Sequence, residues 1–254
     1  MIKKLKILNM YLFIFCCTLS GLYSDELLFR EPEVKPSDAF SMIGDSRTQY
    51  IFLPGNPSAD WEDEPYLGQY RSACSGGKTG IQNAGIAGST ASDWISILRD
   101  GKLKPESLHE RVVVLVGGND VLRHIHKWKG AYSWNITERE EILDAIHSDV
   151  KEIVRILRSW NKSVIVQTHF YANPKVKKAS TKAVNQGVTG LNLRLYESYY
   201  PKDDGKSYDS EVSLAFVKPE FDSKLFFDQV HLNHFGFQFH SYFLNLELQK
   251  RCWW

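Results

Sequence analysis

The sequence predicts an α/β fold of three layers, in which a mostly parallel central sheet of about five strands lies between helices. Short, continuous apolar runs alternate along the chain with longer segments whose apolar residues recur every three or four positions. The apolar runs do not show the strict apolar–polar alternation of half-exposed strands, which is typical of strands that are buried on both faces. Helices between such strands provide the crossover connections that parallel strands require.

Five segments are expected to form strands. The clearest is residues 112–116, five consecutive Val or Leu residues that are followed by two glycines. The other four are shorter or less uniform apolar runs that end near glycine or polar residues. They are residues 39–44, 81–84, 162–170 and 213–218.

Four segments are expected to form helices. In the longest, residues 137–160, Thr137 is followed three residues later by Glu140, which is the signature of a capping box. Apolar residues then recur at three- and four-residue intervals from Ile142 to Leu157 and give the helix one apolar face. The remaining expected helices are residues 91–99, about 179–199 and 235–248.

Composition limits the class of protein. The 254 residues are enough for one α/β domain with a well-filled core, expected at 39–254 after a lead-in segment at 21–38. The chain is 43% hydrophobic and 24% charged, which argues against disorder. Lys and Arg number 31 against 30 Asp and Glu, so nucleic acid is not expected as a partner.

The first twenty residues differ from the rest of the chain. Three lysines within the first six residues precede an apolar run at residues 7–19. That run is shorter than the roughly 20 residues that a helix needs to cross a bilayer. Residues 1–20 are therefore expected to be a secretory signal, cleaved after Ser20 or alternatively after Ser24. The mature protein would be exported, periplasmic or secreted, without a stable membrane span.

Two of the four cysteines lie within the first twenty residues, and the other two lie in the rest of the chain. At the end of the apolar run, Cys17 is an alternative site for lipoprotein anchoring, although the bulky Phe15 and Cys16 before it fit that signal poorly. An N-terminal anchor that is left uncut is a further alternative. Cys74 and Cys252 remain in the mature chain, and the sequence leaves open whether they pair.

Small and polar residues follow the expected strands. In chain order these blocks are "GDS" (44–46), "NAGIAGST" (83–90), "GGND" (117–120) and, before the last helix, "DQVH" (228–231). The carboxyl ends of parallel strands form the edge at which α/β sheets bind their ligands. Each block alone is a weak signal, but together they indicate a functional site at this edge.

With their neighbours the blocks read "IGDSR", "NAGIAGST", "VGGND" and "DQVHLN", and they resemble the four blocks of the SGNH hydrolase superfamily, also called GDSL esterases and lipases. The resemblance spans roughly residues 39–250. It implies the flavodoxin-like SGNH hydrolase fold and cleavage of ester bonds without a metal or organic cofactor. Two features depart from the family: Arg47 stands where Leu is common, and an insertion at about 47–80 separates the first two blocks.

The residue types in these blocks fit nucleophilic catalysis. A serine hydroxyl becomes a nucleophile when a base takes its proton, and histidine titrates near neutral pH. Asp228 and His231 are three residues apart, so on a tight turn the carboxylate can orient the imidazole. We therefore expect Ser46 to be the nucleophile, His231 the general base and acid, and Asp228 its orienting partner.

The resemblance also implies an oxyanion hole. Its three donors would be the backbone N–H groups of Ser46 and Gly88 and the side-chain amide of Asn119. A glycine at position 88 lets the backbone approach the substrate closely. Gly85 is expected to serve the turn, and Asn83 to brace the loop.

The other histidines allow an alternative. Zinc sites use histidine, and "HIH" (His124 and His126) together with "HLNH" (His231 and His234) would supply four rings. No thiolate or His-Glu motif supports this alternative, so no metal is expected. His234 is expected to begin the last helix beside the catalytic pair.

The expected partner is a small-molecule, lipid or glycan ester, and the sequence does not fix its acyl chain or its alcohol. Two alternatives to hydrolysis stay open. In the first, an O-acyltransferase of the same type uses a glycan hydroxyl in place of water. In the second, a non-catalytic surface binding protein uses the same scaffold. A binding protein does not need a matched base and an oxyanion hole, so the second alternative is disfavoured by the intact set of Ser46, Gly88, Asn119, Asp228 and His231.

Overall fold

The computed structural model describes residues 32–36, 38–51, 80–127, 136–176, 179–200 and 209–253. The expected signal, the alternative lipidation site at Cys17, residue Cys74 and residues 52–79 of the insertion lie outside these ranges. Among the described residues, no helix has both the length and the apolar character needed to span a bilayer.

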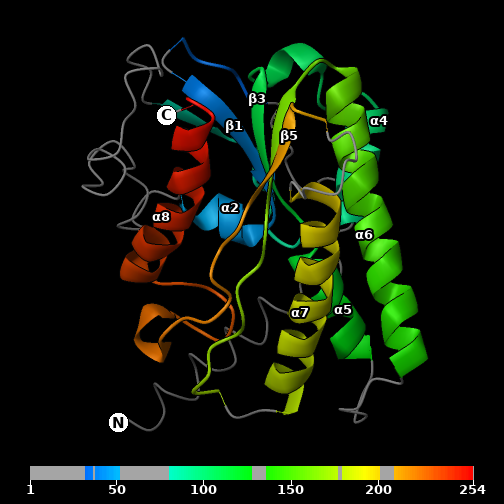
Figure 1. Ribbon diagram of the computed structural model, residues 1–254, viewed down its shortest axis with the longest axis vertical. Helices are drawn as coiled ribbons and strands as arrows, with labels where there is room; N and C mark the ends of the chain where they lie inside the picture. The colour runs from blue at the N-terminus through cyan, green and yellow to red at the C-terminus, as the bar shows by residue number, and fades with distance from the viewer. Residues whose placement is uncertain are drawn as a thin grey trace, which may run out of the picture. The chain divides into compact units, whose positions relative to one another are not determined.

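Five parallel strands form the central sheet, as the sequence predicts (Figure 1). Their order across the sheet is β2-β1-β3-β4-β5, the flavodoxin-like order. Because β1 and β3 are neighbours at the centre, the loops that follow them leave the sheet side by side. The strands are β1 (Asp38–Gly44), β2 (Gly80–Asn83), β3 (Arg111–Leu115), β4 (Ser163–Gln167) and β5 (Val212–Ala215).

Helices cover both faces of the sheet. In Figure 1, α8 lies on one side of the strands, and α4, α6 and α7 lie on the other. Four helices match the expected segments within two residues: α4 (Ala91–Arg99), α6 (Ile136–Ser159), α7 (Ala179–Tyr199) and α8 (His234–Lys250). Two more, α2 (Ser46–Ile51) and α5 (Gly118–Lys127), begin within the "GDS" and "GGND" blocks and were not predicted.

The capping box expected at Thr137 stays a prediction. The helix α6 begins at Ile136, one residue before Thr137, and the Glu140 carboxylate forms ion pairs with Arg139 and Arg194. A capping box is found in α4, where the side chain of Thr90 accepts from the N–H of Asp93.

The strand expected at residues 162–170 is shorter than predicted, because β4 ends at Gln167. The next residue, Thr168, is no longer part of the strand. Its side chain instead accepts the N–H of Val217, in the loop after β5, at 2.8 Å. Residues 168–170 therefore belong to the functional edge of the sheet.

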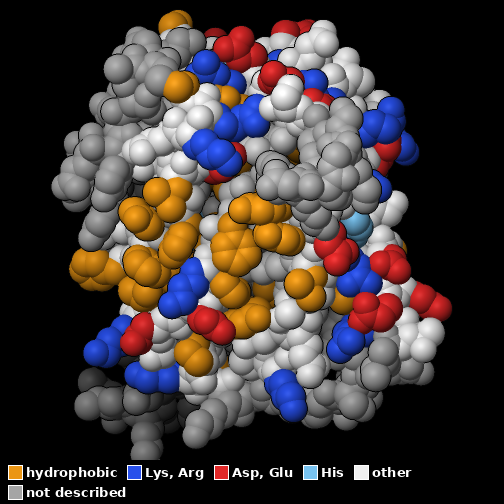
Figure 2. Space-filling model, in the orientation of Figure 1, with side chains coloured by type: hydrophobic (Ala, Val, Ile, Leu, Met, Phe, Trp, Pro, Cys, Tyr) orange, Lys and Arg blue, Asp and Glu red, His pale blue; other side chains and the backbone are white. Residues whose placement is uncertain are grey.

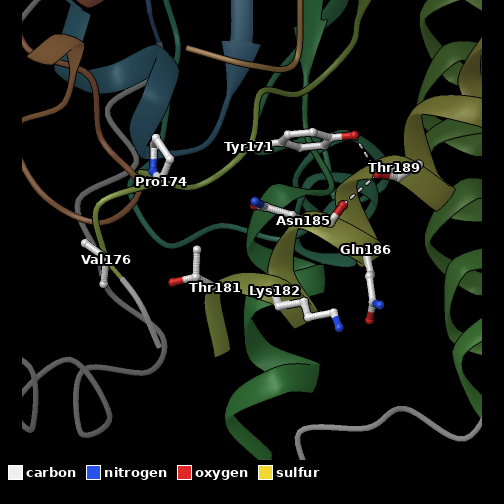
Figure 3. Close-up of a pocket in the computed structure, with 8 residues that line it drawn as sticks. All are labelled: Tyr171, Pro174, Val176, Thr181, Lys182, Asn185, Gln186 and Thr189. Carbon is white, nitrogen blue, oxygen red and sulfur yellow. Dashed lines mark hydrogen bonds between the residues drawn. The ribbon is translucent and has the colours of Figure 1, made fainter. Parts of the chain in front are cut away.

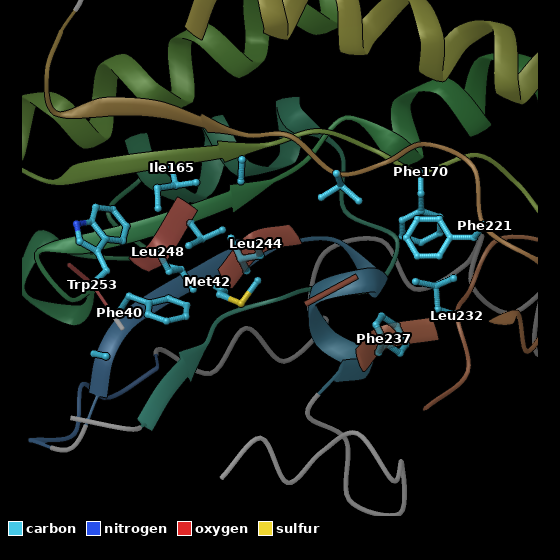
Figure 4. Close-up of a cluster of buried hydrophobic side chains, with 14 of the residues drawn as sticks. Phe40, Met42, Ile165, Phe170, Phe221, Leu232, Phe237, Leu244, Leu248 and Trp253 are labelled. Carbon is cyan, nitrogen blue, oxygen red and sulfur yellow. The ribbon is translucent and has the colours of Figure 1, made fainter. Parts of the chain in front are cut away.

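The core between the sheet and α8 fixes this edge in place (Figure 4). Phe40 and Met42 of β1 pack there with Leu244 and Leu248 of α8, and all four side chains are almost fully buried. Burial of each such side chain stabilises the fold by roughly 1.5–3 kcal/mol. Successive side chains of a strand point to opposite faces, so Ile43, the residue after Met42, faces the helices on the other side of the sheet.

Candidate active site

Ser46 lies where β1 passes into α2 at the carboxyl edge of the sheet. Gly44 makes this turn possible, since a Cβ atom at that position would lie 2.6 Å from the carbonyl oxygen of Leu115. Ser46 is 9% exposed. The turn therefore presents one hydroxyl group from an otherwise buried segment.

Asp228 and His231 lie on a short loop between the 3-10 turn η4 (Ser223–Leu225) and α8. The N–H of Phe227 donates to the carbonyl of His231 at 2.9 Å and closes the loop. Inside the loop, Oδ1 of Asp228 accepts the N–H groups of Val230 and His231, each at 2.7 Å. From the loop after β4, the Asn173 side chain donates to the Asp228 carbonyl at 3.1 Å.

The structure brings these three residues together. Oγ of Ser46 lies 3.0 Å from Nε2 of His231, although the residues are 185 positions apart in the chain. Nδ1 of His231 lies 2.7 Å from Oδ2 of Asp228. Because an ionised carboxylate only accepts hydrogen bonds, Nδ1 carries the ring proton, and Nε2 is free to accept the proton of the serine hydroxyl.

The environment of Asp228 keeps its carboxyl group ionised. Partial burial raises its pKa, but the hydrogen bonds from the ring and backbone of His231 and the backbone of Val230 outweigh that effect. The pKa of Asp228 therefore lies below its ordinary value. At neutral pH this group can orient the imidazole and stabilise its positive form.

The structure places the other two expected donor residues beside the Ser46 turn. Gly88 has φ +79°, a conformation that favours glycine, and its segment is held by the N–H of Ile86, which donates to the Gly44 carbonyl at 2.9 Å. Asn119, in the first turn of α5, donates through Nδ2 to the carbonyl of Ser89 at 3.0 Å. This bond uses one of the two amide hydrogens of Asn119 and leaves the second available for a ligand.

The bracing role expected for Asn83 is confirmed. Its Nδ2 donates to the carbonyl of Thr48 at 3.2 Å, and its Oδ1 accepts the N–H of Gly85 at 2.8 Å. A side chain at Gly85 has no room, because its Cβ would lie 2.4 Å from the backbone nitrogen of Gln49. The loop after β2 is thus joined directly to α2, which carries the nucleophile.

Sequence reasoning missed the role of Arg47, the residue that departs from the family. Its guanidinium is buried beneath the site, 3% exposed, and NH1 lies 3.2 Å from Nδ1 of His169. The guanidinium carbon also lies 4.3 Å from the centre of the Phe170 ring, a cation–π contact. The backbone N–H of Arg47 donates to Oδ1 of the buried Asp45 at 2.9 Å. Arg47 therefore joins the loop after β1 to the loop after β4.

His169 is held in one neutral form. Its Nε2 donates to the carbonyl of Val116 at 2.9 Å, so Nδ1 is the acceptor that faces Arg47. Burial, together with the positive charge of Arg47, lowers the pKa of His169 to about 3. The side chain of Asn192 in α7 accepts the N–H of His169 and donates to its carbonyl, which fixes the backbone here.

The remaining histidines do not form a metal centre in the described part of the chain, where no three His, Cys, Asp or Glu side chains could hold a metal ion. His124 lies on α5. His234 is the first residue of α8, as expected, and follows the N-cap Asn233, whose side chain accepts the N–H of Gly236. The side chains of His126 and His234 lie outside the description.

Comparison with solved structures finds proteins that have the same fold. A lipase from a goat rumen metagenome superposes with a TM-score of 0.54 at 13% identity, covering 82% of this chain and 95% of the lipase. A GDSL-like lipase from Bacteroides thetaiotaomicron superposes with a TM-score of 0.52 at 15% identity, covering 86% of this chain and 91% of the other. No family model and no curated protein matches the sequence. The chain has the fold of the GDSL-type lipases, the SGNH hydrolase fold that its four blocks imply.

Proposed function

We propose that the protein is an exported serine hydrolase that cleaves carboxylic esters through an acyl-enzyme intermediate. Ser46 is the nucleophile, His231 the general base and acid, and Asp228 the residue that orients the ring. The observation that carries this proposal is the unbroken chain of contacts from Ser46 Oγ to His231 Nε2 and from His231 Nδ1 to Asp228. This arrangement takes the proton from the hydroxyl as it attacks.

The reaction proceeds in two steps. In the first, Oγ of Ser46 attacks the ester carbonyl, its proton passes to Nε2 of His231, and the imidazolium then protonates the leaving alcohol. In the second, water gives a proton to Nε2, attacks the acyl-enzyme and releases the acid while Ser46 regains its hydrogen. The N–H groups of Ser46 and Gly88 and the amide of Asn119 stabilise the negative oxygen in both steps. One such donor contributes about 2.7–4 kcal/mol to transition-state stabilisation.

Apolar surface beside the catalytic loop supports binding of an acyl group. Phe227 directly precedes Asp228 and is 79% exposed, and Phe235 at the start of α8 is 66% exposed. Figure 2 shows hydrophobic side chains gathered on the face formed by α8 and its surroundings. An ester with an apolar acyl part therefore meets matching surface next to His231.

Export is supported by one observation in the described part of the chain. Cys252 is disulfide-bonded, and the other three cysteines all lie outside the described residues. Disulfides persist in oxidising compartments such as the periplasm and the extracellular space. The basic and apolar segment at residues 1–20 provides the matching signal.

The experiment that tests the proposed function is hydrolysis of p-nitrophenyl acetate by the purified mature protein. We expect saturable release of p-nitrophenol by the wild type and loss of all but the background rate in Ser46→Ala. Ser96→Ala, a change in an exposed serine of α4, is the matched control and should keep the full rate. A wild type that is folded and inactive, or a Ser46→Ala variant that keeps its rate, would show that the proposal is wrong.

A further inference from the structure

A pocket lies between the loop after β4 and the first half of α7 (Figure 3). Its volume is about 460 Å³, within the range of sites that hold small molecules. The loop after β4 forms one wall and α7 forms the other, with side chains at three- and four-residue spacing along one helix face. The lining residues are Tyr171, Pro174, Val176, Thr181, Lys182, Asn185, Gln186 and Thr189.

The pocket shares its wall with the loop that carries the acid and the base. The N–H of Asn173 donates to the carbonyl of Gln229 at 2.8 Å, and Nε2 of Gln229 donates to Oγ1 of Thr181 in the pocket at 3.2 Å. Val230 and Tyr171 both pack against a buried cluster formed by Ala172, Val184 and Val188. Residues 229 and 230 lie between Asp228 and His231, so the loop that carries the catalytic pair is bonded to a residue that lines the pocket.

The position of the pocket suits the alcohol half of an ester. The imidazolium of His231 must protonate the leaving oxygen, so the alcohol half of the substrate extends toward the loop that carries His231. The acyl half stays on Ser46. A pocket that borders residues 228–231 is therefore placed to hold the alcohol.

Hydrogen bonds between the walls fix the direction of each polar group. The hydroxyl of Thr189 donates to the Asn185 carbonyl at 2.8 Å, so it accepts from the Tyr171 hydroxyl, also at 2.8 Å (Figure 3). Oδ1 of Asn185 accepts the N–H of Ala172 at 2.8 Å. The two hydrogens of Asn185 Nδ2 are left for a ligand, and the Tyr171 oxygen is left as an acceptor.

The free polar groups indicate the chemistry of the ligand. Within the described residues, Lys182 and Gln186 have no hydrogen-bond partner, so they add an ammonium group and an amide to the donors of Asn185. No residue of the described lining is acidic. The rings of Tyr171 and Pro174 supply flat apolar surface beside these donors. Many donors beside flat rings suit a compact group that is rich in hydroxyl oxygens and has apolar C–H faces.

We infer that this pocket binds the alcohol half of the substrate and that this alcohol is a sugar. The inference rests on the proposed function, since it extends the same ester-cleaving site. The hydroxyl oxygens of the sugar accept from Asn185, Gln186 and Lys182, and one sugar hydroxyl donates to the oxygen of Tyr171. A long alkyl alcohol would leave these donors without partners, which is costly when water is displaced.

The test compares esters that share one acyl group. Mono-O-acetylated maltose is compared with hexyl acetate for the wild type and for the double variant Lys182→Ala, Gln186→Ala. We expect the wild type to have a kcat/KM at least about tenfold higher for the sugar ester, since a site built for hydrogen bonding disfavours an analogue without hydroxyls. In the double variant this preference should fall about tenfold, through a higher KM for the sugar ester.

A matched control lies in another pocket, formed by α6 and α7 and lined in part by Lys151 and Tyr199. Lys151→Ala should leave the sugar preference intact. Equal kcat/KM for the sugar and hexyl esters, or a sugar preference that survives the double variant, would overturn the inference while p-nitrophenyl acetate hydrolysis still supports the proposed function. A wild type that hydrolyses none of the three esters would instead contradict the proposed function itself.

Discussion

The nucleophile and its acid–base pair lie in two differently built regions of the protein. Ser46 leaves the end of a central strand, is 9% exposed and stands above a buried network of Asp45, Arg47 and His169. Asp228 and His231 lie on a loop after the sheet, where their side chains are 36% and 23% exposed. The first region depends on the core for its geometry, whereas the second depends on hydrogen bonds within its own loop.

This difference predicts how substitutions divide between stability and activity. A change in the catalytic loop removes few buried contacts, so it should affect catalysis with little effect on folding. A change in the buried network leaves an interior charge or polar group without its partner, which is costly in a folded protein. Activity and stability should therefore respond separately in the two regions.

The largest effect is expected in the catalytic loop. Asn in place of Asp228 keeps Oδ1 as acceptor for the two backbone N–H groups, but it places an amide N–H opposite Nδ1 of His231 and favours the wrong tautomer. For Asp228→Asn we expect kcat/KM to fall roughly 10²–10⁴-fold with an unchanged urea midpoint. Ester hydrolysis and urea unfolding measure the two quantities. A variant that keeps the full rate, or one that unfolds, would contradict the role given to Asp228.

The next effect is expected in the buried network. Arg47→Met removes the cation that lies against His169 and Phe170 and leaves Asp45 without the positive charge beside it. We expect the free energy of unfolding to fall by about 3 kcal/mol. The matched control is Arg99→Met on α4, an exposed ion pair with Glu152, which should change it by less than about 1 kcal/mol. If both variants were equally stable, the buried network would not support the nucleophile.

A smaller change in the free energy of unfolding is expected for each unit by which the pH is lowered. Burial lowers the pKa of both His169 and His240 to about 3, while an unfolded histidine titrates near 6.5. The unfolded chain therefore binds protons first, and stability that is complete above pH 6.5 is lost as the pH falls toward 3. Each ring contributes about 1.4 kcal/mol per pH unit.

Asp120 opposes part of this slope, since burial raises its pKa to about 6 and makes its neutral form the stable one in the fold. The contribution of Asp120 to the free energy of unfolding is complete below pH 3.8 and is lost as the pH rises through 6. Between pH 4 and 6 the net slope for these three groups should be near 1.4 kcal/mol per unit, and His240→Gln should flatten it further. Urea unfolding at a series of pH values measures it. A stability that is constant from pH 7 to 4 would show that these rings are not buried as neutral groups.

The sequence predicted the fold well because its signals are local. Continuous Val and Leu runs and three- to four-residue periodicity mark the strands and the long helices without knowledge of their neighbours. The short helices α2 and α5 were missed because each begins within a Gly-rich block, which is typical of turns. Their helical form depends on contacts that only the folded sheet provides, such as the bonds from Asn83 to α2.

The site was predictable where its residues share a short block. The spacing of Asp228 and His231 allowed their contact to be predicted, and the structure has it at 2.7 Å. The partner of Arg47 could not be predicted, because His169 is 122 positions away and was taken as part of a strand. Functional residues are expected directly after the carboxyl ends of parallel strands. A predicted strand that ended at Gln167, as β4 does, would therefore have drawn attention to His169.

The central claim is that the imidazole of His231 activates the hydroxyl of Ser46. The most direct measurement is intact and peptide mass spectrometry after treatment with a fluorophosphonate, which reacts with activated serines. We expect one adduct per chain, located at Ser46, and labelling at least about 10³-fold slower in His231→Gln. An adduct at another serine, or an equally fast reaction in folded His231→Gln, would contradict it.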